Sequence, residues 1–349
     1  MEVVSLFSGC GGLDLGFTKA GFKLIYANDN DKTVWETFEK NHSISIDKRS
    51  LFDIESDEIP HSDGIIGGPP CQSWSLAGAM RGINDKRGQL FHEYIRVLND
   101  KQPNFFLAEN VPGIVSRTHI KEFNIILSKF NKLGYNVSYK VMDAREYGVP
   151  QERRRVIIVG YRKELGLRFN FPPPTHTKLA GKTIEGKKTP RWRNLGDAIG
   201  DLPDPVPAKA KNHANGSLEI PNHEYMLGSF STIYMSRNRR RKLDEQSYTI
   251  QAGGRHAPLH PSSTEMVKLE KDKWDFKSDH PIYRRLSVRE CARIQTFPDN
   301  FVFYYNNIAE GYKMVGNAVP VKLAEVLAQK IKMDLTEKVN NRLVAAKIF

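Results

Sequence analysis

The chain has 349 residues, 40% of them hydrophobic, so it is long enough for one large domain and a smaller one. Lysine and arginine number 52 against 40 acidic residues, which leaves a net charge of +12 and makes polyanions plausible partners. No apolar run approaches the roughly 20 residues needed to span a bilayer, so a membrane protein is excluded. Three cysteines far apart (Cys10, Cys71 and Cys291), with no signal-peptide pattern, predict a cytoplasmic protein without a metal site.

Short apolar runs alternate with helical patterns through the first half of the chain. Strands are predicted at 3–7, 24–28, 64–66, 104–110, 137–143 and 155–162. Between them, apolar residues recur at helical spacing around Val34 and Phe38, around Tyr94 and Leu98, and from Ile120 to Leu133. This alternation predicts an α/β domain with a mainly parallel sheet.

The texture changes near "FPPPTHT", at 171–177, where prolines and glycines multiply and helical periodicity fades. We therefore divide the chain into a catalytic domain at 1–173, a smaller irregular, β-rich domain at 174–303, and a segment at 304–349 that returns to the first domain. Within the second domain, 231–236 and 247–252 are β-like. Helical spacing returns at 284–299, and a proline-led amphipathic helix is predicted within 316–335.

The first predicted strand runs into "FSGCGGLDLGF", a glycine-rich turn that opens a helix. Such a turn lets the backbone approach a ligand and directs helix N-terminal amides at it, although it also serves as a plain tight connection. The second strand ends in "NDND", where Asp29 is placed to hold ribose hydroxyls. Together these features favour a nucleoside cofactor, while helix N-capping is the structural alternative for Asp29 or Asp31.

The stretch "GGPPCQSWS" places Cys71 after a strand, in a bend that two prolines make rigid. A thiolate held in this way, near a helix N-terminus or a cation, is a strong nucleophile. A buried structural cysteine is the alternative, but such residues seldom occupy a PPCQ bend. The glycine-rich stretch at 75–88 is predicted to be a loop that could close over a substrate.

Two further groups of charged residues adjoin predicted strands. Glu109 ends a strand in an apolar context that could raise its pKa and let it donate a proton, or it is an ordinary salt-bridge partner. In "QERRR", strand alternation points Arg153 and Arg155 to one face and Arg154 to the other. A solvated basic edge is the alternative for the three arginines.

The order of these motifs carries more information than any one of them. The series FSGCGG, GGPPCQ, ENV, QERRR, RRLSVRECARIQTFPD and GNAVP resembles that of DNA (cytosine-5) methyltransferases, over Leu6 to about Lys330. The stretch "NHEYMLGSFSTIYMSRNRRR" looks similar to HaeIII-type bacterial modification enzymes, which modify GGCC. The resemblance implies a Rossmann-like methyltransferase fold with a target-recognition domain. It also implies S-adenosylmethionine as methyl donor, S-adenosylhomocysteine as product, and base flipping.

The resemblance also implies catalytic roles. The Cys71 thiolate would add to cytosine C6, which makes C5 enamine-like, and Glu109 would contact N3 and the exocyclic amine. Arg153 would hydrogen-bond O2, while Arg155 would support the site. Cys10 and Cys291 would be packing residues.

Cofactor-binding positions follow in the same way. The expected set is Phe7, Gly9, Gly11, Asp29, Asn30, Ser50, Leu51, Pro70, Leu90 and Asn317. Two of these depart from the family pattern. Asn30 stands where an aromatic residue often stacks on adenine, and Ser50 stands where an aspartate is expected.

Double-stranded DNA is the implied substrate, with a cognate restriction endonuclease as functional partner and a bacterial monomer as the working form. Arg237, Arg239 and Arg255 match positions that read guanines in HaeIII-type enzymes, and arginine is the commonest specific partner of guanine. Arg240 is expected to contact phosphate, and Arg87 to contact DNA.

Two other functions compete with this interpretation. A nonenzymatic DNA-binding protein on a degenerate methyltransferase fold is weakly favoured by Asn30 and Ser50, but the intact Cys71, Glu109 and Arg153 argue against it. A nicotinamide oxidoreductase would explain the glycine turn but neither PPCQ nor QERRR.

Overall fold

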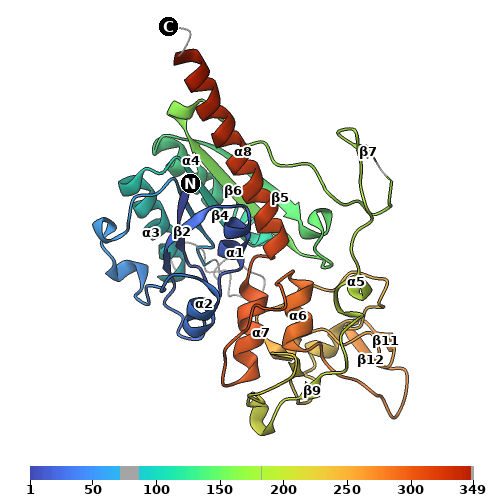
Figure 1. Ribbon diagram of the computed structural model, residues 1–349. Coiled ribbons are helices and arrows are strands. Elements are labelled where there is room, and N and C mark those ends of the chain that lie inside the picture. Colours follow the sequence, from blue (N-terminus) through green and yellow to red (C-terminus); the bar gives the residue numbers. More distant parts are fainter. Residues whose placement is uncertain (71–85, 182, 347–349) are drawn as a thin grey trace.

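The computed structural model describes residues 1–70, 86–181 and 183–346 (Figure 1). The expected nucleophile, Cys71, and most of the 75–88 loop lie outside the described residues. Within these ranges, no helix combines the length and apolar character that crossing a membrane requires.

A six-stranded sheet forms the larger half of the molecule. It confirms the six strands predicted in the first half of the chain. In spatial order the strands are β2 (Lys23–Asn28), β1 (Glu2–Leu6), β3 (Gly64–Gly67), β4 (Phe105–Asn110), β6 (Arg154–Arg162) and β5 (Tyr135–Asp143). The pairs among β2, β1, β3 and β4 are parallel, whereas β6 runs antiparallel to both neighbours. The sheet is therefore mixed rather than parallel throughout.

Helices cover both faces of this sheet, because successive apolar residues in its strands point to opposite sides. On one face, Val3 and Phe105 belong to a core that also contains residues of α1 (Gly12–Lys19) and α8 (Val321–Ala346). On the other, Val4 and Phe106 pack with α3 (Lys86–Lys101) and α4 (Ile120–Lys132). Gly16 lets α1 and α8 approach closely, since a Cβ there would lie 2.4 Å from that of Ala324.

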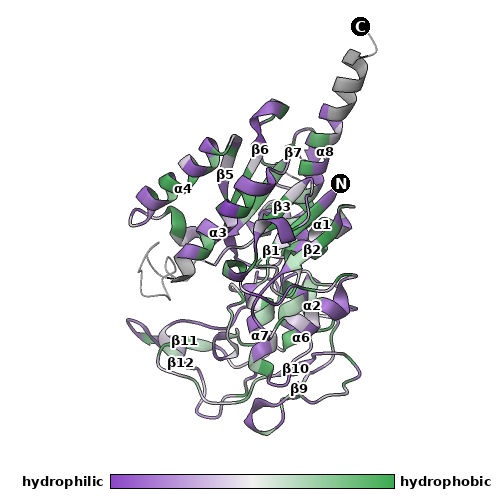
Figure 2. Cartoon of the chain, turned by 90° about the vertical axis from the view of Figure 1, so that its left-hand side faces the viewer, coloured by the Kyte–Doolittle hydropathy of each residue, from purple (hydrophilic) through white to green (hydrophobic). Residues whose placement is uncertain are grey.

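The remaining chain is irregular and holds three two-stranded sheets. Their strands are β7 (Thr183–Ile184) with β8 (Lys187–Lys188), β9 (Val206–Pro207) with β10 (Glu224–Tyr225), and β11 (Met266–Glu270) with β12 (Lys273–Phe276). Helices α5 (Leu195–Ile199), α6 (Val288–Ile294) and α7 (Ile308–Asn317) share a second core with α2 (Trp35–Asn41) through Val34. Figure 2 shows α6, α7 and strands β9 to β12 below the large sheet.

Two strand predictions in this half are wrong. Residues 231–236 end in a 3₁₀ turn, Tyr234–Ser236, in which the Ser231 hydroxyl accepts a hydrogen bond from the Tyr234 amide (3.2 Å). Residues 247–252 form no strand: Ser247 makes only an isolated bridge to Gln151, and side chains bond part of the backbone that follows. Gln151, for example, accepts from the Ile250 amide at 2.9 Å.

The C-terminal helices divide between the two halves. The predicted proline-led helix is α8, which starts directly after Pro320 and packs along α1. Helix α7, which precedes it, was not predicted separately, although Asn307 and Glu310 form a capping box at its start. It contributes Tyr312 and Val315 to the second core.

Candidate active site

The glycine-rich turn between β1 and α1 adopts a left-handed backbone at three positions. The φ angles are +57° at Phe7, +57° at Gly9 and +89° at Gly11. A side chain is excluded at Gly11, where a Cβ would lie 2.0 Å from Nε2 of His42. The turn therefore needs its glycines, and Phe7 accepts a conformation that costs a non-glycine residue energy.

Asp29 holds this turn in place from the end of β2. One carboxylate oxygen accepts a hydrogen bond from the Gly9 amide (2.8 Å) and the other accepts from the Asp31 amide (2.9 Å). Burial raises the pKa of Asp29. Asp31 instead caps the turn before α2, accepting from the Thr33 amide and hydroxyl, and pairs with Lys313 at 2.6 Å. The expected helix N-capping is seen at neither aspartate, because the N-cap residue of α2 is Val34 and no side chain caps it.

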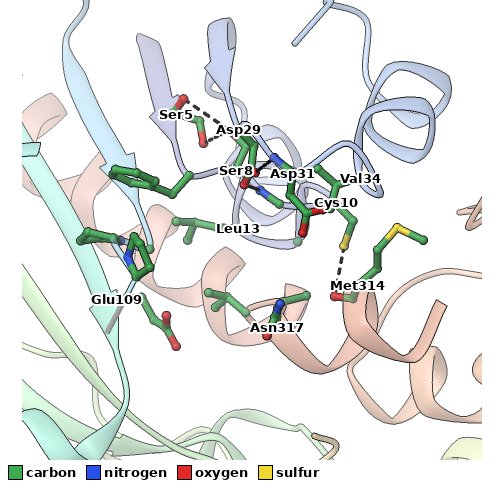
Figure 3. A pocket seen from close by; sticks show the side chains of 18 of the residues that line it. Ser5, Ser8, Cys10, Leu13, Asp29, Asp31, Val34, Glu109, Met314 and Asn317 are labelled. Atoms are coloured by element: carbon green, nitrogen blue, oxygen red, sulfur yellow. Dashed lines mark hydrogen bonds between the residues drawn. The ribbon is translucent and has the colours of Figure 1, made fainter. Parts of the chain in front are cut away.

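A pocket of about 590 Å³ opens beside the turn (Figure 3). The turn and the end of β2 form one wall and α7 another, with Glu109 of β4 at the edge. Seven of the expected cofactor residues line it: Phe7, Gly9, Asp29, Asn30, Pro70, Leu90 and Asn317. Residues from five distant segments therefore meet at one cavity.

Three expected cofactor residues do not line this pocket. Gly11 shapes the turn from behind. Leu51 is 1% exposed and packs in the core beneath α3, so it is a packing residue. The Ser50 hydroxyl accepts from the Phe52 amide (3.5 Å) and caps a short 3₁₀ turn.

Sequence reasoning missed several lining residues. Lys313 and Met314 reach the pocket from α7, one helical turn before Asn317. Helical spacing back from the "GNAVP" motif could have found them. Asp14 also lines the pocket, and burial raises its pKa to about 7, although the Ser5 hydroxyl acts to lower it.

The expected acid, Glu109, is buried at the end of β4 and contacts a guanidinium. Arg155 places Nε 2.8 Å from Oε1 of Glu109, so the surroundings of this carboxylate are not purely apolar. Burial lowers the pKa of Arg155, and Glu109 acts to raise it. Next in sequence, Asn110 donates to the Pro69 carbonyl (3.2 Å) and so ties the strand to the proline bend.

Arg153 does not occupy the position expected for a base-binding residue. Its guanidinium is fully buried and donates to the carbonyls of Ile250 (3.1 Å), Gly316 (3.0 Å) and Ala318 (2.8 Å). Ile250 lies in a loop of the second half, whereas Gly316 and Ala318 lie at the C-terminal end of α7. Arg153 therefore joins the halves, and Arg155 is the arginine beside Glu109.

The expected DNA-reading arginines also separate into two groups. Arg237 and Arg255 are exposed. Arg239 is buried: it donates to the Tyr234 carbonyl and stacks 4.5 Å from that ring, so it is a structural residue. Arg240 is partly buried and donates to the Pro261 carbonyl (3.0 Å). Arg87 lies in α3.

Comparison with known proteins decides between the possible functions of this pocket. Residues 1–333 match the family model of the C-5 cytosine-specific DNA methylases. The chain belongs to this family. It is thus a DNA (cytosine-5) methyltransferase, and S-adenosylmethionine is the methyl donor that membership implies.

Relatives match over nearly the full length. The Type II methyltransferase M.MthTI of Methanothermobacter thermautotrophicus is 59% identical, with 97% of this chain and 99% of the relative covered. M.FnuDI of Fusobacterium nucleatum is 52% identical, with 97% and 96% covered. The crystal structure of a prophage-encoded protein from E. coli, described as a DNA modification methyltransferase, shares the fold (TM-score 0.71, 24% identity, 96% and 99% covered).

Proposed function

We propose that this methyltransferase modifies the inner cytosine of GGCC in double-stranded DNA and protects that DNA from a cognate restriction endonuclease. The observation that carries this proposal is the meeting of two sites. The pocket beside the glycine-rich turn, which Asp29 lines, borders Glu109, and Glu109 pairs with Arg155. A methyl donor and a base could therefore be held edge to edge.

The pocket suits S-adenosylmethionine. Asp29 would bind the ribose hydroxyls, Phe7, Pro70 and Leu90 would supply apolar contact for the adenine, and Asn317 would bind the polar end. The bound cofactor supplies an electrophilic methyl group. The residues around it would hold that group toward Glu109 and exclude water.

The chemistry on the base would fall to Cys71, Glu109 and Arg155. The Cys71 thiolate would form a bond to C6 while the Glu109 carboxyl supplies a proton to N3, so that C5 becomes nucleophilic. Arg155, rather than Arg153, would steady the charge that develops at O2. After C5 is methylated, loss of the C5 proton and departure of sulfur restore the aromatic ring. The cytosine must leave the duplex to reach these groups.

Residues 174–303 would form the target-recognition domain. Arg237 and Arg255 remain available to donate two hydrogen bonds each to guanine O6 and N7. Arg240 and Arg87 would contact phosphates. The choice of GGCC rests on the resemblance of "STIYMSRNRRR" and "QAGGRHAPLHP" to HaeIII-type segments, and we propose that a monomer carries out the reaction.

Transfer of labelled methyl from S-adenosylmethionine to duplex DNA tests the chemistry. Cys71→Ala should abolish transfer yet retain DNA binding, because sulfur is needed only for the covalent step. Glu109→Gln should lose most activity, because the amide cannot supply a proton to N3. Appreciable C5 methylation by the Cys71→Ala variant would refute the covalent assignment.

Protection of plasmid DNA tests the specificity. Plasmid from cells expressing the wild type should resist a GGCC-cutting endonuclease, and Arg237→Ala or Arg255→Ala should weaken that protection. The exposed His280→Ala serves as the control. Full cutting of plasmid that is methylated elsewhere would exclude GGCC while leaving the chemistry intact.

A further inference from the structure

A second, smaller pocket lies in the recognition half. It has a volume of about 200 Å³, and its lining comes from three separate segments: Glu152, Arg237, Asn238, Arg239, Tyr248, Thr249, Gln251, His256 and Pro258. The exposed Arg237 stands at its rim. This pocket is distinct from the cofactor pocket, with which it shares no lining residue.

Shared residues connect this small pocket to the catalytic groups. Glu152 and Thr249 also line a third cavity, of about 490 Å³, which Arg155 borders. Arg155 in turn contacts Glu109 at the edge of the cofactor pocket. The three cavities thus follow one another from the cofactor pocket toward Arg237. A bound duplex would have to extend in this direction, from the base that reacts to the bases that are recognised.

Arginine can read only part of a G·C pair. A guanidinium carries donors and no acceptor, so Arg237 can satisfy guanine O6 and N7. The cytosine of the same pair presents an amino group, a donor, in the major groove. A pocket that distinguishes G·C pairs by both partners therefore needs an acceptor near its arginine.

Two acceptor side chains around the small pocket are already engaged. The Glu152 carboxylate pairs with Arg145 (3.2 Å) and Arg241 (3.1 Å). The side-chain oxygen of Asn238 accepts from the Arg240 amide (2.9 Å). Each of these two side chains is thus committed within the protein.

His256 is differently placed. Its ring is half-buried in the pocket wall, and within the described part of the chain no hydrogen bond reaches it. Burial and the neighbouring Arg239, Arg237, Arg255 and Arg285 lower the pKa of His256, so its imidazole is neutral at neutral pH. A neutral imidazole keeps one nitrogen as an acceptor.

We propose that His256 is a specificity-determining residue: its free ring nitrogen accepts a hydrogen bond from the amino group of a non-target cytosine, beside a guanine bound by Arg237. The inference rests on the proposed function, because it assumes a recognition site rich in G·C pairs. It adds to that function a named reader for cytosine, which the arginines cannot supply.

The test is a double-mutant cycle between protein and DNA. Each non-target cytosine of a GGCC duplex is replaced in turn by 2-pyrimidinone, which lacks the amino group, and binding is measured by fluorescence anisotropy with S-adenosylhomocysteine present. The wild type should bind one of these duplexes about tenfold more weakly than the native site. His256→Ala should bind that duplex and the native site equally, and His256→Gln, which retains an acceptor, should recover part of the discrimination.

His280→Ala is the matched control, since this exposed histidine should leave the tenfold ratio unchanged. Unfolding curves of all variants exclude a folding defect. An equal loss in the wild type and in His256→Ala would overturn the proposal. Methylation mapping of the wild type reports separately on GGCC: if another site is found, the same cycle on that site still tests His256.

Discussion

Two arginines separated by one residue do different work in this methyltransferase. Arg155 lies against a carboxylate that borders the cofactor pocket, whereas Arg153 donates hydrogen bonds to the backbone carbonyls of Ile250, Gly316 and Ala318. Strand alternation places both on one face and so cannot assign the roles; in the structure β6 begins at Arg154, and Arg153 precedes it. The degree of burial separates the two roles, because the second half of the molecule covers Arg153 completely.

This division predicts opposite outcomes for two substitutions. Arg155→Gln should reduce methyl transfer by about 100-fold or more while the protein stays folded. Arg153→Gln should instead lower the free energy of unfolding by about 3 kcal/mol, because buried carbonyls lose charged donors. Arg154→Gln is the control, since that side chain is 70% exposed. Activity assays measure the first effect and denaturant titrations the second. An Arg153→Gln protein with the same free energy of unfolding as the wild type would contradict the account.

Asn30 lines the cofactor pocket, at the position where the family resemblance leads us to expect an aromatic residue that stacks on adenine. Asn30→Tyr should therefore tighten S-adenosylmethionine binding by about 1 kcal/mol, the scale of an aromatic stacking contact. Isothermal titration calorimetry measures the change. No gain in affinity would mean that other side chains already cover the adenine.

The raised pKa of Asp14 predicts that the stability of the folded protein depends on pH. Its pKa is raised to about 7 in the folded protein, against about 3.9 for an unfolded chain, so the folded state binds more protons between these values. Stability from this group is therefore present below pH ~4 and is lost as the pH rises to about 7. Asp14→Asn should remove that loss, so its advantage over the wild type should grow from pH 5 to pH 8. Denaturant unfolding curves measure the difference in stability between the two proteins. The same difference at pH 5 and at pH 8 would contradict this prediction.

At the scale of elements, the regular half was predictable and the irregular half was not. All six strands of the sheet follow from buried apolar runs such as "FFLAEN", which need no partner to be recognised. The segment 247–252 also contains residues that favour strands, Tyr248, Thr249 and Ile250, yet Gln151 and Arg153 bond its backbone groups from far along the chain. A bond between residues about a hundred positions apart leaves no local pattern. Arg239 lies in a run of basic residues, a pattern typical of a solvated surface, yet it is buried and donates to the nearby Tyr234 carbonyl.

Helix α7 links stability to the cofactor pocket. The Asn307 side chain accepts from the Ala309 amide (3.0 Å) and caps the helix that carries Met314 and Asn317. Asn307→Ala should lower the free energy of unfolding by about 1 kcal/mol and weaken cofactor binding. The exposed neighbour gives the control, Asn306→Ala. If the Asn307→Ala protein were destabilised but bound the cofactor with unchanged affinity, the stability of α7 would have no effect on cofactor binding.

At the scale of the whole molecule, the sheet half contributes the glycine-rich turn and Asp29 to the large pocket, and the irregular half carries the exposed Arg237 and Arg255. The segment Gln151–Arg153 joins them, since its side chains bond backbone groups of Ile250, Gly316 and Ala318. Chemistry and recognition are thus fixed to each other through buried hydrogen bonds. This arrangement suits an enzyme that must read a duplex and react at one base within it.

Bisulfite sequencing of plasmid from cells expressing this chain tests the central claim most directly, because it reports activity, position and target together. We predict protection of the inner cytosine of GGCC by the wild type and of no cytosine by the Cys71→Ala variant. Absence of C5 methylation with folded, cofactor-binding wild-type protein, or equal methylation by both proteins, would contradict the account.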